Sequence, residues 1–140
     1  NAVTALARVE NGALADSPAD AIAGSAARET AAVAREQGID LSDERAVSLA
    51  ETVIGDTAAN HSSMYQDISA GQQTEIDAIN GYVADTATKS VPVNETLAGL
   101  VRTWEQYRGQ IGWHASDVTA CRSHTRVRRW YSSGYRRRWG

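Results

Sequence analysis

Residues 17–38 read SPADAIAGSAARETAAVAREQG, and this stretch decides the class of fold. Ser17 is a favoured N-cap residue, and Pro18 suits the first helical position, where no backbone donor is needed. The Ala-rich run that follows has high helix propensity, and Gly38 suits the end of a helix. The stretch therefore predicts one long helix. Its inward-facing side chains are expected to be Ile22, Ala26 and Val33.

Helices are also predicted on both sides of this stretch. Residues 1–10 contain no helix breaker and are followed by Asn11-Gly12, a pair typical of a left-handed helix end. Downstream, residues 42–44 read SDE, an N-cap followed by an acidic first turn that complements the helix dipole. The apolar residues that follow at helical spacing are Val47, Ala50, Ile54 and Ala58.

The second half of the chain predicts three further helices. Ser63, with Gln66 three positions later, forms the pattern of a capping box that opens a short helix ending at Gly71. A second helix begins at residues 74–77, and its apolar stripe is Ile76, Ile79, Val83 and Ala87. After a linker at 91–93, Asn94 is expected to cap a last helix. Its recurring apolar residues are Leu97, Leu100, Val101, Trp104 and Ile111.

The composition agrees with an all-α bundle of five or six helices. Apolar residues make up 42 % of the 140 residues, with alanine the most frequent of them and no phenylalanine, which favours closely packed helices over a sheet. No run approaches the ~20 apolar residues of a membrane span, and no signal peptide is visible, so we expect a cytoplasmic protein. Cys121 is the only cysteine, which excludes an internal disulfide framework and provides no zinc motif.

The charge distribution divides the chain at residue 112. Residues 1–112 hold sixteen acidic and seven basic side chains, whereas residues 113–140 hold one aspartate and seven arginines. We therefore expect a helical domain at 1–112 and a basic Arg/Trp-rich tail at 113–140 that is disordered or encoded out of frame. The alternative, a basic arm that binds nucleic acid, is disfavoured because a short arm without a folded nucleic-acid-binding domain makes only non-specific phosphate contacts.

No phosphate-binding loop, HExxH motif or nucleophile elbow is present. Four blocks nevertheless stand in a distinctive order. They read NAVTAL at 1–6, NHSSMYQDI at 60–68, TEIDAING at 74–81 and VPVNETL at 91–97.

These blocks resemble the C-terminal domain of ketopantoate reductases, whose N-x-S-S-M-x-Q-D segment precedes T-E-I-D-x-[IL]-N-G. The resemblance covers residues 1–112. It implies the helical fold of the C-terminal domain of ketopantoate reductase and 6-phosphogluconate dehydrogenase-like proteins. It also implies an NADP-dependent oxidoreductase, which transfers a hydride from NADPH to 2-dehydropantoate and gives pantoate for pantothenate and coenzyme A synthesis.

The resemblance also assigns roles to five polar residues. Substrate-binding positions of the family match Asn1, Asn11, Asn60 and Ser63, and the glutamate beside the cofactor and the substrate hydroxyl matches Glu75. Without the resemblance, the favoured interpretation is a helix end for Asn60 and an N-cap for Ser63, and Glu75 could be a first-turn acid. His61 is interpreted as a solvent-facing loop residue.

The family's catalytic lysine and N-terminal Rossmann domain, which binds most of the NADP, have no counterpart in these residues. We therefore expect a fragment that is inactive alone, is completed by a separately encoded Rossmann half, and associates with a second copy as a homo-oligomer. The alternative is a non-catalytic helical interaction module or a pseudogene fragment.

Overall fold

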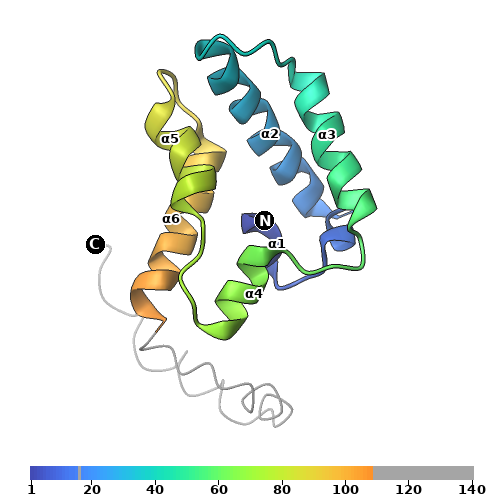
Figure 1. Ribbon diagram of the computed structural model, residues 1–140, viewed down its shortest axis with the longest axis vertical. Coiled ribbons are helices and arrows are strands. Elements are labelled where there is room, and N and C mark those ends of the chain that lie inside the picture. The colour runs from blue at the N-terminus through green and yellow to red at the C-terminus, as the bar shows by residue number, and fades with distance from the viewer. Residues whose placement is uncertain (16, 109–140) are drawn as a thin grey trace, which may run out of the picture. The chain divides into compact units, whose positions relative to one another are not determined.

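The computed structural model describes residues 1–15 and 17–108, and every regular element in them is a helix. The all-α prediction is therefore confirmed. In Figure 1, α2 and α3 run side by side as a hairpin, and α4, α5 and α6 follow along the chain. The elements are α1 Ala2–Ala7, the 3-10 helix η1 Asn11–Leu14, α2 Pro18–Glu36, α3 Asp43–Asp56, α4 Ser63–Ala70, the π-helix η2 Asp77–Gly81, α5 Tyr82–Thr86 and α6 Pro92–Tyr107.

Both ends of α2 and the start of α3 lie where the sequence predicts. The Ser17 hydroxyl accepts a hydrogen bond from the Ala19 N–H at 3.2 Å, and Pro18 occupies the first turn of α2. Gly38 follows the helix with a positive φ of 80°, a conformation that glycine adopts without steric cost. The Ser42 hydroxyl then caps α3 through the Arg45 N–H at 3.2 Å. These local signals fix the ends of α2 and the start of α3, and the two helices run antiparallel (Figure 1).

The main core lies between α1, α4, α6 and the segment before η2. Met64, Ile76 and Val101 are the largest apolar side chains in it that are less than 2 % exposed. A smaller apolar cluster joins the end of α2 to α5 and α6 through Val33, Val83 and Val91. The buried residues of the main core are Ala2, Ala5, Met64, Ile68, Ile76, Leu97, Ala98 and Val101.

The first helix is shorter than predicted. It ends at Ala7, and Arg8 rather than Asn11-Gly12 takes the left-handed conformation, with φ 59°. Gly12 instead lies in η1, where its N–H donates to the Ala58 carbonyl at 2.9 Å. A Cβ at this position would lie 2.8 Å from the Cβ of Ala58. The glycine is therefore required by close backbone approach and not by a helix end.

The capping register of α4 is also one residue from the predicted one. Ser62, not Ser63, is the N-cap, because its hydroxyl accepts from the Tyr65 N–H at 3.1 Å. Gln66 does not complete a capping box, since its side-chain amide donates to the His61 carbonyl at 3.2 Å. The predicted end of this helix at Gly71 is confirmed, with φ 68°.

At α6 the predicted cap Asn94 is instead buried inside the helix. Pro92 begins α6, so most of the predicted linker at 91–93 is helical. The first turn is capped by a residue from α2: the Glu29 carboxylate accepts from the Val93 and Asn94 N–H groups, each at 2.9 Å. A long-range contact thus replaces the local cap that the sequence suggested.

Four residues predicted to face inward are exposed. Three of them are large apolar side chains, Ile22, Ile79 and Leu100. The π-helix η2 shifts the register so that Asn80 and Gly81, and not Ile79, are buried. The fourth, Ala58, lies beyond the end of α3 at Asp56. Two further predictions, for Ile111 and for the segment 113–140, lie outside the described residues.

Candidate functional site

Asn1 is joined to the start of α4 through two buried hydroxyl groups. The Thr4 Oγ1 lies 2.9 Å from the Asn1 carbonyl oxygen and 2.9 Å from the Ser62 Oγ. The Ser62 Oγ lies 3.4 Å from the same carbonyl. Because each hydroxyl carries one hydrogen, these groups form a short chain of hydrogen bonds. The chain fixes the segment just before Ser63 against the first turn of α1.

Asn11 and Asn60 are direct neighbours. The Asn11 N–H donates to the Asn60 carbonyl oxygen at 2.9 Å, and its side-chain amide donates to the Thr57 Oγ1 at 2.9 Å. This approach is possible because α1 ends at Ala7, so the chain turns before it reaches Asn11. The structure therefore brings Asn11 and Asn60 together, although the Asn11 side chain already holds a structural contact.

A surface depression of about 700 Å³ lies beside Asn60. Its aromatic wall is formed by His61 and Tyr65, whose ring centroids lie 4.2 Å apart. His61 is half-buried, so the prediction that it faces solvent is only partly met. Ser63 is the exposed first residue of α4 and, by helical spacing, shares a side of that helix with Gln66. The residues lining the depression are Ala59, Asn60, His61, Tyr65, Gln66, Ser69 and Ala70.

A second cavity, of about 490 Å³, opens beside Asn1. It is lined mainly by small apolar residues of α2, α3, η2 and α5. Its buried polar groups are already engaged, because the Asn80 amide donates to the Asn94 Oδ1 at 2.8 Å, and the Asn94 amide donates to the Glu29 Oε2 at 2.8 Å. Sequence reasoning missed this network, since nothing local pairs Glu29 with Asn94.

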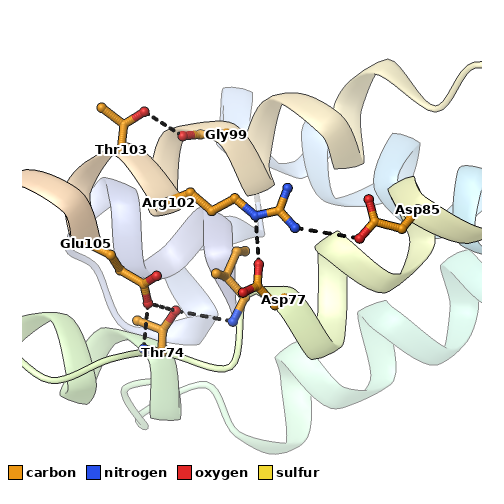
Figure 2. Close-up of polar contacts among 8 residues, drawn as sticks. Thr74, Asp77, Asp85, Gly99, Arg102, Thr103 and Glu105 are labelled. Carbon is orange, nitrogen blue, oxygen red and sulfur yellow. Dashed lines mark hydrogen bonds and ion pairs between the residues drawn. The ribbon is translucent and has the colours of Figure 1, made fainter.

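Glu75 is exposed, and the residues on either side of it, Thr74 and Ile76, are buried. Figure 2 shows how its segment is attached to α6, with Thr74 bound to Glu105 and Asp77 bound to Arg102. The hydrogen bond from the Arg102 guanidinium to the Asp77 carboxylate raises the pKa of Arg102. None of the contacts around Asn1, Asn11 and Asn60 described above includes Glu75. Its membership of the same site stays a prediction.

The polar groups predicted for the site carry chemistry suited to recognition. Neutral amides and hydroxyls can donate to a carboxylate or ketone, and a carboxylate such as that of Glu75 can accept from a hydroxyl. The only lysine of the sequence, Lys89, is exposed in the connector between α5 and α6 and is no candidate proton donor for this site. Among the described helices, none is both long and apolar enough to span a membrane.

Residues 1–105 match the family described as ketopantoate reductase PanE/ApbA C terminal. The 2-dehydropantoate 2-reductase of Halobacterium salinarum is 42 % identical over 106 residues, which are 73 % of this chain and 35 % of that protein. The Shigella flexneri 2-dehydropantoate 2-reductase is 36 % identical, over 80 % of this chain and 37 % of that protein. The chain thus spans only a little over a third of the length of these relatives.

The fold is also similar to a solved structure. The crystal structure of a PanE/ApbA family ketopantoate reductase from Ralstonia eutropha JMP134 superposes with a TM-score of 0.69 at 30 % identity. The superposition covers 78 % of this chain and 38 % of that one.

Proposed function

We propose a function from one premise: this chain belongs to the ketopantoate reductase PanE/ApbA C-terminal family. On that premise, residues 1–108 form the substrate-side domain of a 2-dehydropantoate 2-reductase, which reduces 2-dehydropantoate to pantoate with NADPH. The observation that carries the proposal is the match over residues 1–105, together with the hydrogen bonds that draw Asn11 to Asn60 and Asn1 to the start of α4.

The polar residues would divide the recognition of substrate and cofactor between them. Asn1, Asn11, Asn60 and Ser63 offer neutral donors to the carboxylate and ketone oxygens of the substrate. Glu75 accepts from the substrate hydroxyl and lies beside the cofactor. These groups bind and orient the substrate, because neutral donors are sufficient at the ketone before the alkoxide forms. Protonation of the alkoxide requires a separate acid.

That acid and most of the cofactor site would come from a nucleotide-binding domain. NADPH supplies the hydride when bound, and the proton donor of the family is a lysine that these 140 residues do not contain near the site. We therefore propose a partner domain of Rossmann type, in the same longer polypeptide or encoded separately. By itself, the 140-residue chain should show no reduction of 2-dehydropantoate by NADPH.

A chimera tests this function. The matching segment of the Halobacterium salinarum reductase is replaced by residues of this chain, so that the relative supplies the rest of the protein. We expect NADPH oxidation that depends on 2-dehydropantoate, and a loss of roughly 10²–10³-fold in kcat/KM on Glu75→Ala, as for removal of one preorganised polar group at a reacting centre.

Glu95→Ala is the matched control, because Glu95 is an exposed acid in the first turn of α6 and is assigned no role in the site. Its kcat/KM should equal that of the parent chimera. A folded chimera without activity, or equal losses from Glu75→Ala and Glu95→Ala, would contradict the proposal.

A further inference from the structure

We infer that Glu105 of α6 is a positioning residue that holds Glu75 in place, an inference that rests on the role proposed for Glu75. The two glutamates lie thirty positions apart in the sequence and on different elements. Glu105 does not act on the substrate in this scheme. It acts through the backbone of the residue that precedes Glu75.

The Glu105 carboxylate binds Thr74 twice. Its Oε1 accepts from the Thr74 N–H at 2.7 Å and from the Thr74 hydroxyl at 2.8 Å. The same Thr74 hydroxyl oxygen then accepts from the Ile76 N–H at 3.2 Å. Figure 2 shows these bonds as a continuous path from α6 into the segment before η2. Both peptide neighbours of Glu75 are therefore linked, directly or through one hydroxyl, to a single carboxylate.

Burial makes this link rigid. Thr74 is 9 % exposed and Ile76 is fully buried, whereas Glu75 between them is exposed. The Glu75 carbonyl oxygen also accepts from the Ala78 and Ile79 N–H groups, each at 3.1 Å, at the start of η2. The backbone of Glu75 is thus held on both sides, and only its side-chain torsions are left to vary. Such preorganisation matters because a displacement of about 1 Å at a reacting centre can cost about a hundredfold in rate.

A second contact to α6 is weaker. The Arg102 Nε lies 2.7 Å from the Asp77 Oδ1, and its Nη2 lies 3.8 Å from the Asp85 Oδ2. The three side chains are 43 %, 65 % and 74 % exposed, so solvent screens their attraction. The Glu105 contacts are of similar length but join a partner, Thr74, that is only 9 % exposed, so Glu105 is the main positioning residue.

Enzyme kinetics of the chimera separate positioning from a general structural role. Glu105→Ala should lower kcat/KM by roughly 10–100-fold. Glu105→Gln, which keeps an oxygen that can accept from Thr74, should recover most of that loss. The decisive variant is Glu75→Ala with Glu105→Ala, which should be no slower than Glu75→Ala alone, because Glu105 has nothing to position once the Glu75 carboxylate is gone. Glu95→Ala again serves as the control.

Equal losses from Glu105→Ala with and without Glu75→Ala would overturn the inference, because the effect would then be independent of Glu75. Amide hydrogen exchange of the 140-residue chain gives a test that needs no activity. Glu105→Ala should speed exchange at Thr74 and Ile76 by at least roughly tenfold while leaving the amides of α2 unchanged. Unchanged exchange at these two amides would refute the contact itself, whereas an inactive chimera with faster exchange would refute the proposed function instead.

Discussion

The main core and the α2–α3 hairpin differ sharply in what they bury. The core encloses Met64 and Val101 almost completely, whereas α3 buries only Ala46 and leaves Leu49 43 % and Val53 60 % exposed. The segments on which Asn1, Ser63 and Glu75 lie all belong to or border the main core. Large side chains therefore hold the predicted site in place, while the hairpin is attached through alanines, the small cluster around Val33 and a few polar bonds.

The largest expected effect comes from the main core. Met64→Ala removes a side chain that is 1 % exposed and should lower the free energy of unfolding by about 2–5 kcal/mol. Leu49→Ala on α3 should change it by less than about 0.5 kcal/mol, because that side chain is already in contact with water. Urea unfolding of both variants measures the two changes in the free energy of unfolding. Equal losses would show that the two regions do not differ in packing.

A smaller effect is expected where the two regions meet. Glu29→Ala removes the acceptor of the Val93 and Asn94 N–H groups and leaves the buried Asn94 amide without its carboxylate partner. We expect a loss of about 2–3 kcal/mol, typical of charged hydrogen bonds with one buried donor left unpaired. Thermal unfolding followed by circular dichroism checks this value. Glu44→Ala, at an exposed acid in the first turn of α3, is the control and should have little effect.

The sequence predicted the hairpin well and the polar links poorly, for a physical reason. Ser17, Pro18 and Ser42 act on their own helices, so their effect can be read from spacing alone. Glu29 caps a helix more than sixty residues away, and no local pattern announces such a contact. The π-helix that exposes Ile79 is likewise a tertiary effect. The family resemblance supplied Asn60 and Ser63, but only the structure identified Ser62 as the helix cap.

Gly12→Ala tests how tightly η1 is packed against Ala58, just before the hairpin begins. The added Cβ would lie 2.8 Å from the Ala58 Cβ and 3.0 Å from the Ala58 carbonyl oxygen, so the backbone must shift. We expect a loss of about 1–2 kcal/mol, as for modest overpacking. Gly55→Ala on α3 is the control, because a Cβ there meets nothing within 4 Å. A stability equal to that of the parent would show that η1 and Ala58 can separate freely.

The smallest effect on stability is expected at the exposed apolar side of the hairpin. Leu49→Ser with Val53→Ser should change the free energy of unfolding by less than about 0.5 kcal/mol per site. We propose that the chain associates with a second copy, and exposed apolar residues favour such contacts. Light scattering at high concentration should therefore show association of the parent chain and less of it in the double variant. A monodisperse monomer at high concentration would contradict the proposed association.

The order in which the chain is synthesised determines when Glu29 can cap α6. A ribosome synthesises α2 before α6, because α2 precedes it in the sequence. The carboxylate is therefore available before the N–H groups of Val93 and Asn94 emerge. Because a single domain generally folds as a unit, α6 gains this cap only after both helices have been synthesised, and the N-terminal half of the domain must wait for Val93 and Asn94 before Glu29 finds its partners.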